Sequence, residues 1–367
     1  MKITCHSDNN SITEVGLDNM NQLALNLFSQ LIKENPEQTC FIGDHQISIS
    51  GYSYTLSFGK EKLIRVLRDT EEAGFRYYFV SDKALGTGGV GEVYQAVKFK
   101  VEKDYKLLPG TREYAVKAVR HKICLQSEEE IAKQLDYMHA KTVLTIGEEA
   151  YFVMAKLENR PVCSIDEAFS FTLSFLENLR HLHQLNIAHR DLHPANILFD
   201  GKTVRTIDFN NSLIIETVQY KHNDLFRWYE RSRAILSSFK NEIPNEIGSL
   251  IIREFDDFIK SDYAKKLMTD DTSTARRTKT VSFSQNGTPE EYNVLMDRAV
   301  DELRKLIQSW QEKLKIAAQN ENVSTKQLNQ FGFFATTTQD NTSTSKAEEQ
   351  LSSIVGNTCL KLGDTPG

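Results

Sequence analysis

The segment that most constrains this chain is IAHRDLHPANILFD, residues 187–200. A helical apolar pattern ends just before it, in LRHLHQL, and a short apolar run, NILF, closes it. Between them lie Asp191 and Asn196. An aspartate there can accept the proton of an attacking hydroxyl, and an asparagine carbonyl can bind Mg²⁺. This order makes a chance polar loop improbable, so we interpret the segment as a catalytic loop.

A second carboxylate, Asp208, follows in TIDFN, residues 206–210. It comes after an apolar strand residue and before Phe209. A carboxylate that follows Asn196 at this short distance completes a ligand set for Mg²⁺–ATP. An isolated Asp-Phe pair would indicate nothing, so the interpretation of Asp208 depends on the loop before it.

Two motifs upstream suit the binding of phosphates. LGTGGVGEV lies between two expected strands, and glycine lets a backbone close over a triphosphate. A dinucleotide-binding fold would need a helix after such a turn. YAVKAV places Lys117 in a strand, where a buried cation needs a partner. A lysine that faces solvent is the alternative for this motif alone.

The four motifs, in this order and rough spacing, resemble eukaryotic-type protein kinases over about residues 76–230. The resemblance implies an ATP-dependent phosphotransferase that uses Mg²⁺ or Mn²⁺ and acts on a protein hydroxyl. It implies Asp191 as the catalytic base, and Asn196 and Asp208 as metal ligands. It also implies Lys117 as the phosphate-binding cation, Gly86, Gly88, Gly91 and Val93 over ATP, Ala115 and Leu198 with Val93 around the adenine, Met154 as gatekeeper, and Ala155 to Leu157 as the hinge.

A predicted helix at residues 127–139 offers two glutamate partners for Lys117. Helix phase favours Glu128, because the apolar residues after it continue the same face. Counting back from His139, as in many kinases, favours Glu130. Both glutamates stay candidates at this point.

The chain departs from the kinase pattern in and after the catalytic loop. His193 stands where serine/threonine kinases carry a lysine, and an imidazole can still contact the γ-phosphate. Asn210 replaces a glycine; we expect it to adopt positive φ and its amide oxygen to approach the metal. No A-P-E follows, so Arg190 lacks a loop phosphate. Asp224 either braces the backbone of the catalytic loop or caps its own helix.

The pattern predicts an α+β, bilobal protein-kinase-like fold, with a small β-sheet N-lobe carrying one helix, a mainly helical C-lobe, and extra helices at both ends. In the N-terminal part, residues 17–32 and 60–68 are expected to be helical and residues 41–58 strand-like. Ser164 is the expected N-cap of a long helix, and residues 290–318 are expected to form another. The expected parts are an extension at 1–75, the N-lobe at 76–160, the C-lobe with a short activation segment at 161–266, a mobile loop and helix at 267–318, and a disordered tail at 319–367.

Composition limits the partners and the compartment. The net charge is -6, which disfavours a general nucleic-acid binder. No apolar run approaches the length of a membrane span, and no secretory signal pattern opens the sequence. The five scattered cysteines lack a C-x-x-C pair, so we expect a reducing, cytoplasmic compartment.

The short C-lobe, helical C-terminus and polar tail resemble atypical bacterial kinases, in particular effector kinases that Legionella-type bacteria translocate into host cells. This resemblance implies action in host cytoplasm in response to a host cue. Basic clusters suggest an inositol phosphate or phosphoinositide as that cue, with peripheral membrane association; solvated surface charge is the competing interpretation. The clusters are Lys60, Lys62, Arg65 and Arg68, and Arg276, Arg277 and Lys279.

Two other functions remain open. His193 and the missing A-P-E also suit a small-molecule kinase of the aminoglycoside-phosphotransferase type. A pseudokinase that binds nucleotide as a scaffold is the third hypothesis. All core positions keep competent residue types, which disfavours the pseudokinase.

Overall fold

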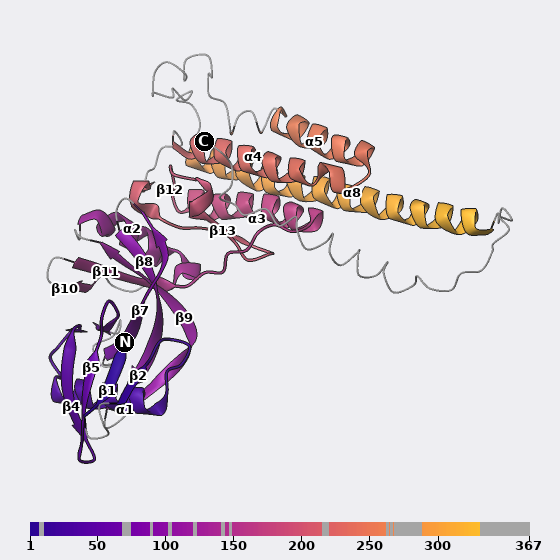
Figure 1. The fold of residues 1–367 in the computed structure, drawn as a ribbon. Coiled ribbons are helices and arrows are strands. Elements are labelled where there is room, and N and C mark those ends of the chain that lie inside the picture. The colour runs from indigo at the N-terminus through magenta and orange to yellow at the C-terminus, as the bar shows by residue number, and fades with distance from the viewer. Residues whose placement is uncertain are drawn as a thin grey trace, which may run out of the picture. The chain divides into compact units, whose positions relative to one another are not determined.

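The computed structural model describes residues 1–6, 11–67, 75–88, 91–101, 105–119, 123–140, 144–146, 149–214, 220–261, 264, 267 and 288–330. The chain divides into two compact units, Met1–Leu157 and Glu158–Gly367 (Figure 1). The first unit holds most of the strands and the second most of the helices, which confirms the expected α+β content.

A seven-stranded antiparallel sheet with the order β10-β11-β9-β8-β7-β6-β3 organises the first unit. Successive residues of β7 belong in turn to two apolar clusters, Tyr77 and Phe79 to one and Tyr78 and Val80 to the other, so this part of the sheet is covered on both faces. Helix α2 (Ile123–Gln134) packs against β11 and continues into a 3₁₀ turn, Asp136–Met138. The strands are β3 (Cys40–Phe41), β6 (Lys62–Leu67), β7 (Phe75–Thr87), β8 (Gly91–Val101), β9 (Leu107–Val119), β10 (Leu144–Ile146) and β11 (Glu149–Ala155).

The N-terminal extension shares a core with this sheet and is not a separate domain. Its own sheet has the order β2-β1-β5-β4, and helix α1 (Gln22–Glu34) buries one apolar face. The Phe28 ring of α1 lies 5.9 Å from the Phe58 ring, 5.6 Å from Phe79 of β7 and 6.0 Å from Phe99 of β8. The added strands are β1 (Lys2–Cys5), β2 (Ser11–Glu14), β4 (Asp44–Ile49) and β5 (Tyr52–Ser57).

The helix predicted at residues 60–68 is wrong, because residues 62–67 form strand β6. The sequence KLIRVL is rich in branched apolar residues, and pairing with β3 and β7 buries both faces of the strand. Lys62 forms an ion pair with Glu149 at 2.9 Å. The buried guanidinium of Arg65 donates to the backbone carbonyls of Pro36 and Glu37. Arg68 lies outside the described residues.

Four α-helices and two short pairs of antiparallel strands are the main elements in the described part of the second unit. Helix α3 (Ile165–Gln184) packs against both α4 (Lys221–Ser238) and α8 (Pro289–Gln330), and α5 (Asn245–Ile259) contacts α4 and α8 (Figure 1). Strand β12 (Ile187–Ala188) pairs with β15 (Leu213–Ile214), while β13 (Ile197–Phe199) and β14 (Val204–Thr206) form a hairpin.

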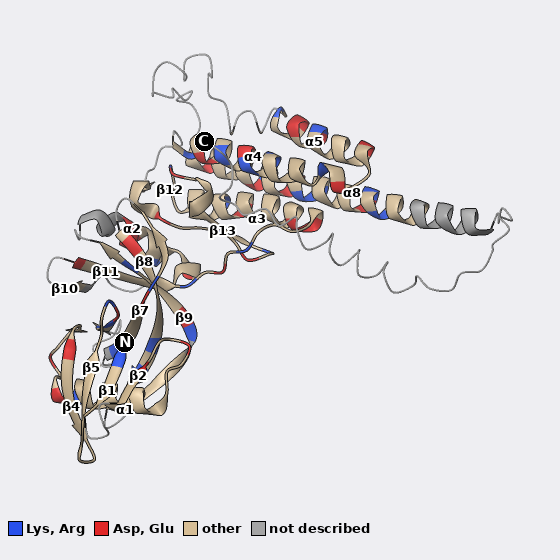
Figure 2. Ribbon diagram, viewed as in Figure 1, with Lys and Arg blue, Asp and Glu red and all other residues tan. Residues whose placement is uncertain are grey.

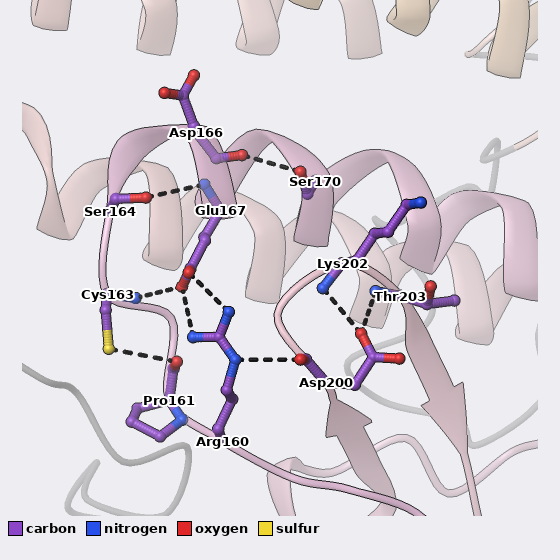
Figure 3. Close-up of polar contacts among 10 residues, drawn as sticks. All are labelled: Arg160, Pro161, Cys163, Ser164, Asp166, Glu167, Ser170, Asp200, Lys202 and Thr203. Carbon is purple, nitrogen blue, oxygen red and sulfur yellow. Dashed lines mark hydrogen bonds and ion pairs between the residues drawn. The ribbon is translucent and has the colours of Figure 1, made fainter.

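Ser164 caps α3, as predicted, and its neighbours fix the adjoining hairpin (Figure 3). The Ser164 hydroxyl accepts from the backbone N–H of Glu167 at 3.2 Å. The Glu167 carboxylate pairs with Arg160 at 2.7 Å, and the Arg160 guanidinium also donates to the carbonyl of Asp200 at 3.0 Å. Because Asp200 begins the turn between β13 and β14, the start of α3 is linked to the strands that carry the catalytic segment.

Helix α8 presents one buried stripe to the rest of its unit. Tyr292, Met296, Leu303 and Trp310 lie on this stripe. The predicted helix at residues 290–318 is confirmed, but it continues to Gln330, so the expected start of the disordered tail at 319 is too early. The predicted mobile loop lies mostly outside the described residues, as do Arg276, Arg277 and Lys279 and the tail from residue 331.

Charges of both signs alternate along α4, α5 and α8 (Figure 2). Several are paired within one helix turn, including Arg304 with Asp301 at 2.7 Å and Lys305 with Glu302 at 3.1 Å. Mixed charge of this kind is typical of a solvated helix face. Within the described residues, every helix is too short or too polar to cross a membrane.

Candidate active site

The glycine-rich turn joins β7 and β8. The backbone N–H of Gly88 donates to the carbonyl of Gly91 at 2.9 Å, and Gly86 pairs with Val93 across the hairpin. A Cβ at Gly91 would lie 2.2 Å from the carbonyl oxygen of Ala118 on β9. Glycine is therefore required at position 91 by the close approach of β9. Residues 89 and 90, at the tip, lie outside the described residues.

Lys117 and Glu128 form a buried ion pair within the first unit. The Lys117 Nζ lies 2.8 Å from Glu128 Oε2, and the two side chains are 6% and 1% exposed. Lys117 lies near the C-terminal end of β9, opposite Val93 of β8 and Phe152 of β11. Glu130, the other candidate, is exposed. Helix phase thus gave the partner of Lys117, since the apolar residues that follow Glu128 on the same face are buried: Ile131, Ala132, Leu135 and Met138.

The residues expected around the adenine lie in neighbouring strands of the same sheet. Ala115 of β9 is directly opposite Met154 of β11. Ala115, Met154 and Ala155 are buried, while Leu157 is partly exposed just after β11 ends. The backbone N–H of Lys156 donates to the carbonyl of Glu113 at 3.4 Å, which holds the start of the expected hinge against β9.

In the second unit, Asp224 braces the catalytic loop. Its Oδ2 accepts from the backbone N–H of His189 at 2.7 Å, and its Oδ1 accepts from the N–H of Arg190 at 2.8 Å. Asp224 lies in the first turn of α4, whose N-cap is Tyr220, so Asp224 does not cap the helix. Of its two predicted roles, the brace is confirmed and the cap is wrong. Arg190, with φ of 67°, needs this support because its backbone is left-handed.

Arg190 lies over an aromatic ring. Its guanidinium carbon is 5.0 Å from the centre of the Tyr220 ring. The segment before Tyr220, residues 215–219, lies outside the described residues. The contact with the Tyr220 ring stabilises the positive charge of Arg190. The sequence offers no phosphorylated residue in the activation segment that would pair with this charge.

His189 links the catalytic loop to the strand before Asp208. Its Nε2 lies 3.0 Å from the carbonyl oxygen of Ile207, and its ring centre is 4.9 Å from that of Phe209. Burial lowers the pKa of His189, so the ring is neutral and Nε2 donates to this carbonyl. The N–H of Ile207 in turn donates to the carbonyl of Asn196 at 3.0 Å. These contacts hold the two expected metal-binding segments next to each other.

Two asparagines orient Asp191. The amide nitrogen of Asn196 donates to the backbone carbonyl of Asp191 at 2.9 Å. The amide nitrogen of Asn211 donates to Asp191 Oδ2 at 3.0 Å. The sequence interpretation missed Asn211, although it directly follows the Asp-Phe-Asn motif and its side-chain type could have suggested a polar contact. The contact with Asn211 fixes the rotation of the Asp191 carboxylate, which keeps lone pairs that can accept a substrate proton.

The turn at Asp208 differs from the expectation. Asp208 itself has the positive φ, 66°, whereas Asn210 lies in a 3₁₀ turn, Phe209–Asn211, and does not. The predicted positive φ at Asn210 is therefore wrong. Aspartate is among the residues that tolerate a left-handed backbone, because its short polar side chain can bond locally. Here the Asn210 amide nitrogen donates to Asp208 Oδ1 at 2.5 Å.

The oxygen atoms of this segment fit a hard divalent cation. The Asn196 amide nitrogen is committed to Asp191, so its Oδ1 is the atom left for a metal. Asn210 Oδ1 is buried and accepts no hydrogen bond from the described residues. Those residues contain no cluster of three or more His, Cys, Asp and Glu side chains. Asn196 and Asp208 would therefore share the metal with phosphate oxygens and water, as Mg²⁺ prefers.

The two other expected residues of this unit lie just before and within strand β13. His193 is exposed and is the N-cap of the 3₁₀ turn Pro194–Asn196. Leu198 is half-buried in β13 and pairs with Arg205 of β14. The exposure of His193 leaves its imidazole accessible to a ligand.

Residues 79–242 match the family model of the protein kinase domain. This match, together with the site geometry, supports placing that region in the protein kinase superfamily. Over 136 residues, 34% of the chain, it is 26% identical to a probable serine/threonine-protein kinase of Dictyostelium discoideum. Over 198 residues, 44% of the chain, it is 27% identical to another from that organism, mkcD.

A mammalian protein is also similar. The chain is 28% identical over 139 residues, 34% of its length, to the human rhodopsin kinase GRK1. The matched regions cover 30%, 30% and 25% of these three relatives. The similarity thus concerns the kinase region and not the relatives' full length.

Proposed function

We propose that this protein transfers the γ-phosphoryl group of ATP to a hydroxyl group of a protein. The observation that carries the proposal is the fixed position of Asp191, whose carboxylate is held by Asn211 at 3.0 Å and whose backbone is held by Asn196 at 2.9 Å. An aspartate oriented in this way can accept the proton of an attacking hydroxyl. The match of residues 79–242 to the protein kinase domain supports the same chemistry.

The other residues of the proposal divide the remaining tasks. Lys117 contributes a cation for the α- and β-phosphates, and the 2.8 Å contact with Glu128 fixes its ammonium. Asn196 and Asp208 hold Mg²⁺ or Mn²⁺, which when bound neutralises charge on the phosphate oxygens. Gly86, Gly88 and Val93 cover the nucleotide. Asp224 maintains the backbone from which Asp191 projects.

The acceptor is a serine or threonine hydroxyl in this proposal. Support comes from the two Dictyostelium relatives, whose names describe serine/threonine-protein kinases. The alternative to a protein kinase is a small-molecule kinase. His193 favours this alternative, because it replaces the usual lysine and is exposed. Its imidazole would then contact the γ-phosphate with a charge that varies near neutral pH.

The experiment is incubation of the full chain with γ-labelled ATP and Mg²⁺ or Mn²⁺, alone and with myelin basic protein or an aminoglycoside. Label on the chain itself or on myelin basic protein, absent with Asp191→Ala, is the expected result. Label on the aminoglycoside alone would favour the small-molecule rival. Binding of ATP without transfer to any acceptor would favour the pseudokinase.

The role as a translocated bacterial effector and the switch by an inositol phosphate stay predictions from the sequence. Two cations of the first basic cluster have other partners, since Lys62 pairs with Glu149 and Arg65 binds backbone carbonyls. The second cluster, in residues 276–279, lies outside the described residues. Stimulation of phosphotransfer by an inositol polyphosphate is the measurement that would support the switch.

A further inference from the structure

One side chain of helix α8 contacts the hydrogen-bonded residues that support the catalytic loop. The Tyr292 hydroxyl lies 2.8 Å from Nδ1 of His183, a residue of α3. Tyr292 is 3% exposed and His183 is fully buried, so water does not compete for this contact. The proposed transfer chemistry assigns no task to either residue.

The partners of His183 define its protonation. Its Nε2 lies 3.2 Å from Oδ2 of Asp224. An ionised carboxylate can only accept a hydrogen bond, so Nε2 carries the hydrogen. Burial lowers the pKa of His183, and the ring is therefore neutral with a lone pair on Nδ1. Burial also raises the pKa of Tyr292 well above its usual value, so the phenol keeps its proton and donates it to that lone pair.

The same carboxylate supports the catalytic loop. Asp224 Oδ2, which His183 contacts, also accepts from the N–H of His189 at 2.7 Å, and Oδ1 accepts from Arg190 at 2.8 Å. A chain of hydrogen bonds therefore runs from Tyr292 through two side chains to the backbone just before Asp191. In each of these hydrogen bonds one group donates its hydrogen and the other group accepts it.

The charges around His183 reinforce this arrangement. The Lys221 ammonium donates to the carbonyl of His183 at 2.7 Å and to Asn186 Oδ1 at 3.2 Å, and it lies 5.2 Å from the Tyr292 ring centre. Its positive charge disfavours an imidazolium at His183, while Asp224 favours one and burial decides for the neutral ring. The His222 ring also borders Tyr292, with 6.3 Å between the centres of the two rings.

We propose that Tyr292 is a positioning residue: its hydroxyl holds the His183 ring in the orientation in which Nε2 donates to Asp224, so α8 helps to set the backbone geometry of the catalytic loop. Without the hydroxyl, the buried Nδ1 loses its donor. The ring can then turn from this orientation, which weakens the hydrogen bond from Nε2 to Asp224 Oδ2. The kinetic consequence rests on the proposed phosphotransfer, whereas the orientation of the ring does not.

The test compares the full-length wild type with Tyr292→Phe. ¹⁵N-histidine NMR, with His183 assigned by its absence in His183→Gln, reports which ring nitrogen carries hydrogen. We expect hydrogen on Nε2 in both proteins, and in Tyr292→Phe a shift of the unprotonated Nδ1 resonance towards that of a ring nitrogen that accepts no hydrogen bond. We expect kcat to fall about tenfold, the equivalent of one charge-assisted hydrogen bond, with the KM for ATP within about twofold of wild type.

Trp310→Phe is the matched control on the same helix. It removes the 2.8 Å hydrogen bond from Trp310 Nε1 to Glu254 but leaves His183 and Tyr292 in place. This variant should keep the wild-type Nδ1 resonance of His183 and wild-type kcat even if it lowers the melting temperature as much as Tyr292→Phe does.

Several results would overturn the proposal. Hydrogen on Nδ1 of His183 in the wild type would do so without any variant, even if Tyr292→Phe failed to fold. An unchanged Nδ1 resonance or an unchanged kcat in a folded Tyr292→Phe protein would also contradict it. A wild type without phosphotransfer would refute the proposed function, and the NMR comparison would still decide the contact between Tyr292 and His183.

Discussion

Lys117 and Glu128 form a 2.8 Å ion pair that is almost completely excluded from solvent. Removal of one member of such a pair leaves a buried charge without compensation, which costs about 3–5 kcal/mol. The pair is thus a sensitive point at which to test the proposed roles of Lys117 and Glu128.

We expect Glu128→Gln to lower phosphotransfer at least about tenfold, because the ammonium of Lys117 loses its fixed position. Glu130→Gln is the matched control, since Glu130 is exposed on the same helix. Turnover and the KM for ATP are measured for both variants, with urea unfolding as the check on stability. Equal losses in the two variants would refute the assignment of Glu128.

Asp224→Asn should weaken the catalytic loop. The carboxylate accepts from two backbone N–H groups and from His183, whereas an amide offers one oxygen and turns a donor towards the others. We expect the free energy of unfolding to fall by about 2 kcal/mol and turnover to fall with it. Asp257→Asn, at an exposed ion pair with Lys260 in the same unit, should change neither quantity. An Asp224→Asn protein with wild-type stability and turnover would contradict the bracing role.

Gly201 leaves room for Arg160, whose contacts with Glu167 and Asp200 link the start of α3 to the turn between β13 and β14. Its φ is +99°, and a Cβ there would lie 1.7 Å from the Arg160 Nη2. Gly201→Ala should therefore displace Arg160 from Glu167 and Asp200 in addition to straining the backbone. Gly43→Ala is the control, because Gly43 has φ of +72° and no atom within 4 Å of its Cβ position. Its cost is the left-handed strain alone, about 1–2 kcal/mol. Chemical denaturation should show a larger loss of unfolding free energy for Gly201→Ala than for Gly43→Ala. A smaller loss for Gly201→Ala would contradict the stabilising role of the Arg160 contacts.

The buried His222 predicts a loss of stability in acid. Burial lowers its pKa from 6.5 to about 4, so the unfolded chain binds a proton at a pH where the folded chain does not. The contribution of His222 to stability is complete above pH 6.5 and is lost as the pH falls towards 4, by up to about 3 kcal/mol. Urea unfolding at a series of pH values should show a shallower acid dependence in His222→Gln. A slope equal to that of the wild type would exclude His222 as a cause.

Much of the site could be predicted because its motifs are local. Asp191, Asn196 and Asp208 lie within a short stretch whose flanking helix and strands have clear apolar patterns. The choice between Glu128 and Glu130 also needed only helix phase, since one face of α2 is buried. The role of Asp224 was harder to predict, because its partners His189 and Arg190 are distant in sequence.

The errors have physical causes beyond local pattern. Residues 62–67 carry apolar residues at spacings that suit a helix, and only the neighbouring strands β3 and β7 make them a strand. The positive φ was expected at Asn210 because it replaces a glycine, but the structure has it two residues earlier, at Asp208, whose Oδ1 accepts a hydrogen bond from Asn210. Asn211 and Tyr292 were missed since nothing in a single sequence pairs them with Asp191 and His183.

The most direct test of the central claim compares the wild type with Asp191→Asn and Asp208→Asn in one phosphotransfer assay with a calorimetric measurement of Mg²⁺–ATP binding. Loss of the base should lower turnover about a hundredfold or more while Mg²⁺–ATP still binds. Loss of the metal ligand Asp208 should weaken Mg²⁺–ATP binding as well. Wild-type turnover in Asp191→Asn would contradict the assignment of Asp191 as the base and, with it, the proposed mechanism.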